Sequence, residues 1–329
     1  MSNRTNQILL PWAIFLFTAV FGVCFWLKAL LVSYSAAFPA KEDVLFYSLN
    51  QVLPYDSFEA KITAFAAVIL LGVFLFLANR KYLFLREKSS FLIFFLILLI
   101  GINEGSHSLN PGVIGLVFML LAFVRFLGMF ENRYSVWNSF DIGFYLSLGS
   151  LFFFEMIYYV PIFWMGYFLY QQFNIKTLIA SFMGCLTPYA LVAGIFFLTD
   201  NLDTLIFSIV QNFDVSFLGM TFYTPWNIAS FALIIIIALI AFVHFIVQYN
   251  NDKIKTRGTL LFVYLLLVFS IFLGLFSEDI FLFEMPLICL FLSIIFTHFF
   301  SINTSRFSRF VFYAFWVLSI IGYSIQNIL

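Results

Sequence analysis

The chain has 329 residues, of which 64% are hydrophobic and only 10% are charged, and its mean hydropathy is +1.05. A soluble domain of this composition could not cover its surface with polar groups, so the sequence predicts a polytopic membrane protein. The apolar runs are continuous instead of alternating with period two, which favours transmembrane helices over an outer-membrane barrel. The formal net charge is zero, so the charge gives no indication of nucleic-acid binding.

Eleven apolar runs predict an all-α transmembrane bundle of about eleven spans in a single domain over residues 1–329. The first run is too long for the apolar part of a signal peptide and is expected to remain as a span. The third, fifth and sixth runs are short for a full crossing. The predicted spans are Leu9–Val32, Ile62–Ala78, Phe91–Ile102, Gly112–Phe130, Asp141–Phe154, Met156–Tyr170, Thr177–Thr199, Asn227–Tyr249, Thr259–Phe276, Met285–Phe300 and Phe310–Ile325.

Two polar segments between the spans carry apolar residues at helical spacing and predict short helices on the membrane surface. One lies within residues 33–60, with Glu42 and Asp43 near its N-terminus, and the other lies within residues 200–224. Acidic residues at a helix N-terminus also serve as ordinary caps, so a structural role for this pair stays open.

The charged residues predict how the chain lies in a membrane. With the N-terminus in the cytoplasm and the C-terminus in the periplasm, 12 of the 16 basic residues fall in cytoplasmic segments, as the positive-inside rule requires. Twelve of the 16 acidic residues fall outside, among them an acidic loop with Glu278, Asp279 and Glu284. Acids contribute little to topology, so their grouping indicates an external polar cavity, to which a divalent metal ion could bind.

Glu155 is the first candidate functional residue, because it lies within LFFFEMIYYVP with no other charge nearby. A carboxylate that faced lipid there would cost several kcal/mol, so we expect it at a turn, in water or in a protein-lined cavity. One helix of 30 residues would be about 45 Å long, too long for an ordinary crossing, and a hairpin of two short helices is the better prediction.

The other candidates for chemistry lie in the same half of the chain: Glu42, Asp43, Glu104 and His107. Carboxylates at an outer membrane face can act as general bases, metal ligands or proton carriers, and a loop histidine can act as a base or be merely solvated. His244 and His298 have no metal-ligand spacing and receive no role. No nucleotide-binding, metalloprotease or hydrolase motif is present, so the sequence names no cofactor.

The layout resembles the membrane core of C-type glycosyltransferases. The resemblance covers residues 1–200 and is carried by the acidic first loop, by SLNPGVIGLVFMLLAFVRF and by the helix pair GFYLSLGSLFFFEMIYYVPIFWMGYFLY. It implies a polyprenyl-phosphate-linked sugar as substrate, Glu42 or Asp43 as base, and Lys41, Glu104, His107 and Glu155 around the substrate. The chain departs from that family in having few basic residues at the outer face and no long final domain.

The segment FNIKTLIASFMGCLTPYALVAGIFFL also resembles an uncharacterised family of bacterial multi-pass proteins, which implies the inner membrane and no established activity. Residues 201–329 would add a surface helix and four spans. Three functions therefore stay open: a glycosyltransferase-like enzyme or binder, a non-catalytic subunit that docks a membrane-protein partner, and a proton- or ion-coupled transporter with Glu155 as carrier.

Overall fold

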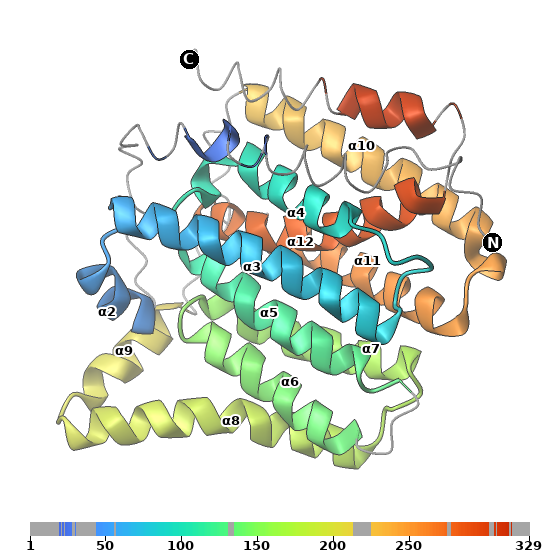
Figure 1. Cartoon of the computed structure of the whole chain (residues 1–329). Helices are drawn as coiled ribbons and strands as arrows, with labels where there is room; N and C mark the ends of the chain where they lie inside the picture. The colour runs from blue at the N-terminus through green and yellow to red at the C-terminus, as the bar shows by residue number, and fades with distance from the viewer. Residues whose placement is uncertain are drawn as a thin grey trace.

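A computed structural model describes residues 20, 22, 24–27, 30, 44–55, 57–130, 135–212, 225–274, 278–302, 306, 308–315 and 317. Within these ranges the regular structure is all helical, which confirms the predicted all-α class (Figure 1). The elements are α2 (Val44–Val52), α3 (Phe58–Tyr82), α4 (Phe91–Ile102), η2 (Glu104–Ser106), α5 (Pro111–Leu127), α6 (Ser135–Ser150), η3 (Phe154–Tyr158), α7 (Tyr159–Leu169), α8 (Ile175–Leu198), α9 (Leu202–Asn212), α10 (Pro225–Gln248), η4 (Tyr249–Asn251), α11 (Ile254–Gly274) and α12 (Glu278–Ile302).

Four helices of the described chain are long and apolar enough to cross a membrane, and this makes the protein a membrane protein. They are Phe58–Tyr82, Ile175–Leu198, Ile254–Gly274 and Phe281–Ile302, and shorter apolar helices cover Phe91–Ile102, Pro111–Leu127 and Ile235–Asn251. The predicted total of about eleven spans is therefore shown only in part. Most of the first predicted span and the end of the last lie outside the described residues.

Local sequence explains where several helices begin. The Asn110 side chain accepts a hydrogen bond from the Val113 N–H, and Pro111 occupies the first helical position of α5, where a missing N–H costs nothing. Asn174 and Thr177 form a reciprocal capping box at the start of α8. These caps fix the polar ends of two otherwise apolar helices.

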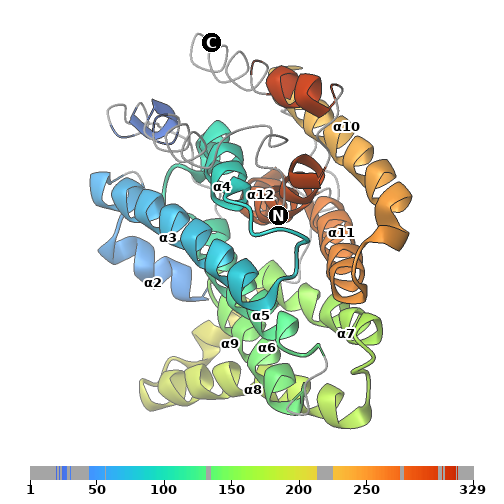
Figure 2. The same cartoon turned by 45° about the vertical axis from the view of Figure 1, so that its right-hand side comes forward.

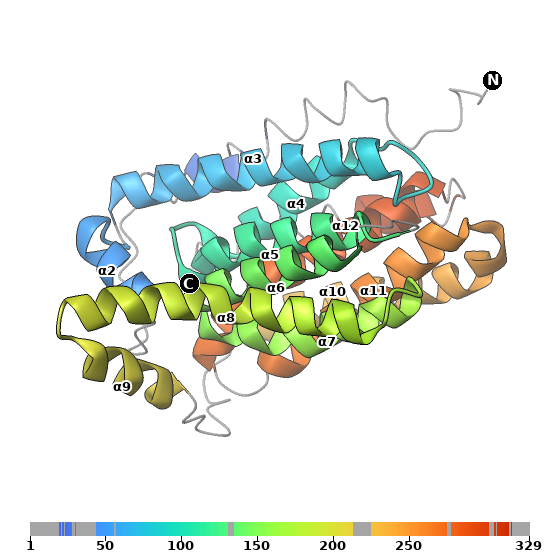
Figure 3. The same cartoon turned by 90° about the horizontal axis from the view of Figure 1, so that it is seen from below.

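The core of the bundle is centred on α4 and α12, which lie between α3 and α11 (Figure 2). Eleven of the twelve residues of α4 are buried, and the helix lies between α3 and α12 (Figure 3). The Phe95 ring stacks on Phe300 at a centroid distance of 5.4 Å and meets Phe296 edge-on at 5.7 Å. Many of the aromatic side chains are therefore packed inside the bundle, and protein covers α4 on nearly all sides.

Glycines allow two pairs of helices to approach backbone to backbone. A Cβ on Gly143 of α6 would lie 2.0 Å from the Ser181 carbonyl oxygen, and one on Gly184 of α8 would lie 2.1 Å from the Phe140 carbonyl oxygen. Likewise, a Cβ on Gly112 of α5 would lie 2.0 Å from the Phe283 carbonyl oxygen of α12. Small residues at such crossings are what membrane helix packing requires, and the last of them holds α5 against the start of α12.

The α6–α7 hairpin predicted around Glu155 is confirmed. The Asn138 side chain, near the start of α6, lies beside Gly128, and Tyr170, which follows α7, stacks on Phe126 with ring centroids 4.4 Å apart. Both ends of the pair therefore return to the C-terminal end of α5. Glu155 lies in η3, at the turn between the two helices.

The links between helices gather at two opposite ends of the bundle. At one end, the Leu45 N–H donates to the Leu151 carbonyl, α2 contacts α9, and Gly105 approaches Leu282 (Figure 1). At the other end, the Lys255 ammonium lies 5.3 Å from the Tyr82 ring centroid and 5.5 Å from that of Phe130. Both segments that were predicted to form short surface helices are helical, as α2 and α9, and both lie at the first of these ends.

The prediction of a loop over residues 278–284 is wrong. Glu278, Asp279 and Glu284 were expected in a loop before a span at Met285, but α12 already begins at Glu278. The reason is that the apolar residues between the acids pack against neighbouring helices: Phe283 meets the Phe153 ring at 6.0 Å and Phe281 packs on Gly274. Helix formation lets α12 bury this face, and Glu284 enters the bundle with it.

Candidate functional site

The site is built where three elements meet at the end of the bundle that contains the α6–α7 turn. Gly112 holds α5 against the Phe283 backbone, and the Phe153–Phe283 ring contact holds η3 against the same turn of α12. These contacts bring Glu155, in η3, and Tyr159, at the start of α7, close to Glu284. Pro286 lies inside α12 and has no N–H, so the Leu282 carbonyl receives no helical hydrogen bond from that position.

Glu284 is the central residue of this site, and its side chain is 0% exposed. The Tyr159 hydroxyl donates a hydrogen bond of 2.6 Å to its Oε2 atom. The Ser270 hydroxyl on α11 hydrogen-bonds in turn to the Tyr159 oxygen. The other carboxylate oxygen, Oε1, is buried and has no hydrogen-bond partner among the described residues. A buried polar atom without a partner is unusual and calls for a chemical reason.

Glu155 supplies a second carboxylate to the same place. Its side chain is only 4% exposed, and it is close enough to both Glu284 and Tyr159 for their charges to interact. We call Glu155, Tyr159, Ser270 and Glu284 the carboxylate cluster. The expectation that Glu155 lies at a turn and in a protein-lined position is confirmed.

The chemistry open to the carboxylate cluster is that of proton or cation binding. Two carboxylates in an apolar interior repel each other and lose their hydration, so an additional positive charge, such as a proton, relieves both costs. Hydroxyl groups on Tyr159 and Ser270 supply hydrogen bonds without adding charge. No group of three or more His, Cys, Asp or Glu side chains in the described parts of the chain could hold a metal ion.

His107 lies in a different set of contacts. Its Nε2–H donates to the Gly101 carbonyl at 2.8 Å, and its ring is 4.8 Å from that of Trp26. Burial lowers the pKa of His107 to about 4, and the nearby Lys61 charge lowers it further, against the Gly101 hydrogen bond. The residue is therefore neutral at pH 7, and it packs between Trp26 and the end of α4 instead of lying in water.

The structure describes the other predicted site residues only in part. Glu42, Asp43 and Lys41 lie outside the described residues, although α2 begins directly after them. Glu104 is the first residue of η2, and its backbone lies in the loop that contacts the start of α12. The Leu45–Leu151 hydrogen bond of 3.0 Å brings the start of α2 to within four residues of Glu155 in the chain.

A second buried polar group occupies the opposite end of α12. The Nε2 atom of His298 lies 3.2 Å from Oδ2 of Asp252, and the two side chains are 4% and 0% exposed. His244 on α10 is near enough to interact electrostatically with both. These three residues, which we call the His–Asp cluster, come from α10, from the link before α11 and from α12.

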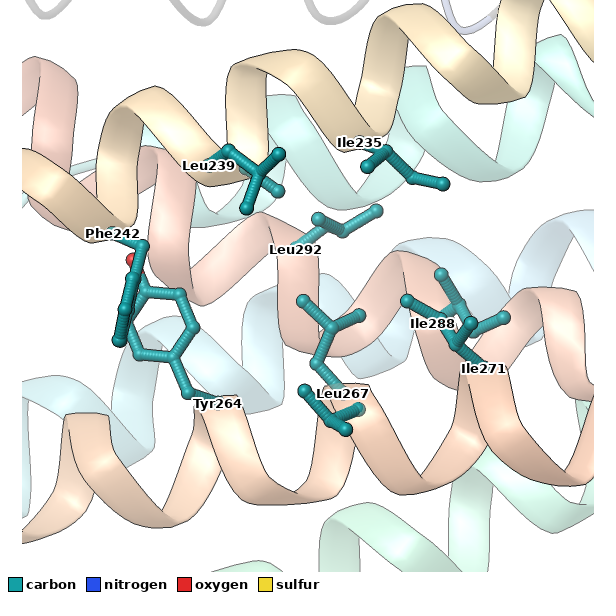
Figure 4. A pocket seen from close by; sticks show the side chains of 10 residues that line it. Ile235, Leu239, Phe242, Tyr264, Leu267, Ile271, Ile288 and Leu292 are labelled. Carbon is teal, nitrogen blue, oxygen red and sulfur yellow. The ribbon is translucent and has the colours of Figure 1, made fainter.

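An apolar pocket of about 230 Å³ lies between α10, α11 and α12 (Figure 4). Its lining includes Leu239 on α10, Leu267 on α11 and Leu292 on α12, and Ile288, one turn after Glu284, lies at one end. Tyr264 and Phe242 close the other end in the same view. The lining offers few hydrogen-bonding groups, so this pocket suits apolar groups and is not a candidate catalytic site.

Comparisons of the chain with protein-family models, with curated proteins and with solved structures found no match.

Sequence reasoning missed Glu284, Tyr159, Ser270 and Asp252. For Glu284 a signal was present, because IFLFEMPLICL surrounds a single acid with apolar residues just as the segment around Glu155 does. The two neighbouring acids at Glu278 and Asp279 made the whole stretch resemble a loop. The hydroxyl partners and the His–Asp cluster depend on contacts between distant segments and leave no local pattern.

Proposed function

We propose that this chain is a proton-coupled membrane transporter in which Glu284 binds and releases the coupling proton. The observation that carries the proposal is the Glu284 side chain itself, fully buried among membrane-spanning helices, with Oε1 lacking a hydrogen-bond partner among the described residues. Ionisable residues inside membrane bundles are costly and are typical of proton and ion pathways.

The neighbours of Glu284 support proton binding specifically. In an interior of low dielectric constant, an ionised Glu284 beside an ionised Glu155 would cost several kcal/mol, and protonation of one of the two carboxylates removes most of that cost. Tyr159 still donates to Oε2 when Oε1 carries the proton. Both charge states therefore keep a hydrogen bond, which lets the proton come and go without breaking the cluster.

The surroundings provide what coupling requires, namely a protonation site at a junction between separate helices. Glu155 lies at the turn of the α6–α7 hairpin, Ser270 on α11 and Glu284 on α12. A change in proton occupancy alters the attraction between these elements, and a substrate that prefers one arrangement would then be coupled to the proton. We place the protein in a bacterial inner membrane, with the cluster at the periplasmic end, as the distribution of basic residues favours.

Proton flux into proteoliposomes tests this proposal. Purified protein is reconstituted with an internal pH-sensitive dye, and a potassium diffusion potential drives protons inward. We expect flux above empty liposomes for the unaltered chain and at least a tenfold reduction for Glu284→Gln. The matched control is Glu59→Gln on α3, because this acid is exposed and should leave the flux unchanged.

A second readout separates proton binding from transport. A protonated Glu284 gives a carboxylic C=O stretching band in infrared difference spectra between acidic and alkaline pH, and Glu284→Gln removes it. Absence of both flux and this band in the unaltered chain would refute the proposal. Flux that survives in Glu284→Gln would refute the assignment to this residue.

A second candidate function is the glycosyltransferase-like one, acting on a polyprenyl-phosphate-linked sugar. The observation that favours it is the docking of α2 on the α6–α7 turn, because Glu42 and Asp43 directly precede α2 and the turn contains Glu155. Sugar transfer from a polyprenyl-phosphate donor by membranes containing the chain tests it. Loss of transfer in the Glu42→Gln, Asp43→Asn double variant supports this function, and unchanged transfer excludes that mechanism.

A further inference from the structure

Asp252 is unusual for a residue in a link between helices. The residues on either side of it, Asn251 and Lys253, are exposed, whereas Asp252 itself is buried at 5% exposure. Its carboxylate is directed inward to His298, with 3.2 Å between Oδ2 and Nε2. These two atoms are not aligned for a hydrogen bond, so neither carboxylate oxygen of Asp252 has a hydrogen-bond partner among the described residues. The link thus places one acid inside the bundle, a single residue away from solvent.

The environment of this pair is mainly aromatic. The rings of Phe245 and Phe299 lie 6.3 Å from His298 and 5.1 Å from His244, respectively. The Arg257 guanidinium on α11 lies 5.0 Å from the centroid of the Tyr249 ring. Among the described residues, His244 from α10 and Asp252 from the link interact electrostatically within this cluster, whereas Tyr249, Arg257 and Tyr264 belong to the aromatic contacts around it.

The His–Asp cluster and the carboxylate cluster share one helix. Glu284 and His298 are fourteen residues apart on α12, which is about 21 Å along the axis and close to four full turns, so both lie near the same face. The residues at intermediate turns of that face are apolar, namely Ile288, Phe291 and Ile295. Two buried titratable groups therefore mark the two ends of one apolar helix face.

We propose that His298, paired with Asp252, is a second proton-binding site, through which protons are exchanged between the bundle and the solution at the end opposite Glu284. A proton from solvent binds the unprotonated ring nitrogen of His298 and converts the imidazole to an imidazolium, whose charge the Asp252 carboxylate balances from 3.2 Å away. Release returns that proton to water or passes it inward. This inference rests on the proposed proton function of Glu284 and assigns the site at the far end of the path.

A purely structural role explains the His–Asp cluster less well. Holding a link against a helix does not need a buried carboxylate, because an apolar residue of similar size would do so at lower cost in desolvation. A buried acid whose two oxygens make no hydrogen bond among the described residues lowers stability, and a neighbouring imidazolium offsets that cost. The exposed residues on either side of Asp252 place the pair close to the surface of the bundle, as a proton-exchange site requires.

Histidine NMR tests this inference without relying on transport. The chain is labelled with ¹⁵N-histidine in nanodiscs, and the three histidines are assigned with His107→Gln, His244→Gln and His298→Gln. We expect the His298 nitrogens to change from the neutral to the charged pattern between pH 8 and pH 5. Asp252→Asn should shift that midpoint by at least one pH unit, Asp252→Glu should restore it, and Lys253→Gln is the exposed control. A His298 signal that stays in one charge state over this range overturns the inference.

The flux assay then separates this inference from the proposed function. We expect His298→Gln and Asp252→Asn to reduce proton flux at least fivefold while the infrared band of Glu284 remains. If both variants keep the flux of the unaltered chain and Glu284→Gln abolishes it, the far-end site is wrong and the proposed function stands. If the unaltered chain shows neither flux nor the band, the proposed function fails, and a titrating His298 then stands as a proton site without a path.

Discussion

The Tyr159 hydroxyl donates a hydrogen bond of 2.6 Å to Oε2 of Glu284, a residue 125 positions further along the chain. This bond joins the α6–α7 hairpin to the start of α12 in a part of the bundle from which lipid and water are excluded. It makes the position of Glu284 depend on a hairpin whose own turn contains a second acid. The stability and the chemistry of this region are therefore linked, and both can be measured.

Tyr159→Phe removes the donor and retains the ring. We expect it to lower the free energy of unfolding by about 1–3 kcal/mol, because a buried carboxylate oxygen then loses its hydrogen bond. The thermal midpoint in detergent measures the effect. Tyr313→Phe is the control, since Tyr313 is 53% exposed and should change little. Equal midpoints for the two variants would contradict the importance of the bond.

Gly184→Ala should separate α6 from α8. The new Cβ would lie 2.1 Å from the Phe140 carbonyl oxygen, so the helices must move apart at a cost of about 3 kcal/mol. The same helix offers a matched control in Gly194, where a Cβ would meet nothing within 4 Å. Gly194→Ala should raise stability by about 0.5–1 kcal/mol through helix propensity alone. If both variants shift the thermal midpoint in the same direction, the close crossing is not as described.

His107 predicts a dependence of stability on pH. Burial lowers its pKa from 6.5 in the unfolded chain to about 4 in the folded protein, so the unfolded chain takes up the proton first as the pH falls. The contribution of neutral His107 to the free energy of unfolding is complete above pH 6.5. It is lost progressively as the pH falls towards 4, by up to about 3 kcal/mol.

His107→Gln should remove that part of the loss, because glutamine can still donate to the Gly101 carbonyl and does not titrate. Chemical denaturation at pH 7 and at pH 4.5 measures both proteins. The difference between the two pH values should be smaller for the variant. An equal difference would show that His107 does not carry this dependence.

Cysteine labelling tests the assignment of links to the two ends of the bundle. Asn201→Cys and Lys253→Cys are made on a Cys24→Ser background, because Cys24 is exposed whereas Cys185 and Cys289 are buried. A membrane-impermeant maleimide should label residue 201 in intact cells, and residue 253 only after the membrane is permeabilised. Labelling of both positions from one side would contradict the two-ended arrangement, and reversed labelling would invert the proposed orientation.

Much of the local structure could be predicted from the sequence, and the contents of the site could be predicted only in part. The predicted span Phe91–Ile102 coincides with α4, because its apolar run is bounded on both sides by polar residues. The hairpin around Glu155 was predictable from the cost of placing a charge in lipid. Glu284 was not, because hydropathy summed along the chain cannot show whether an acid near the end of a span faces solvent or the bundle interior. Its partners are set by helix packing that joins residues more than 100 positions apart.

The burial of α4 also determines the order in which the molecule can be assembled. At twelve residues, α4 is about 18 Å long, shorter than the hydrocarbon layer, and lipid covers almost none of it. The residues that cover it include Phe296 and Phe300 of α12. They also include Phe312, which follows α12 in the sequence and whose ring lies 5.9 Å from that of Phe91. During synthesis, some two hundred residues must therefore follow α4 before its final neighbours exist. The central helix of the folded protein is therefore among the last to reach its native surroundings. Until α12 has been made, other parts of the new chain have to cover α4.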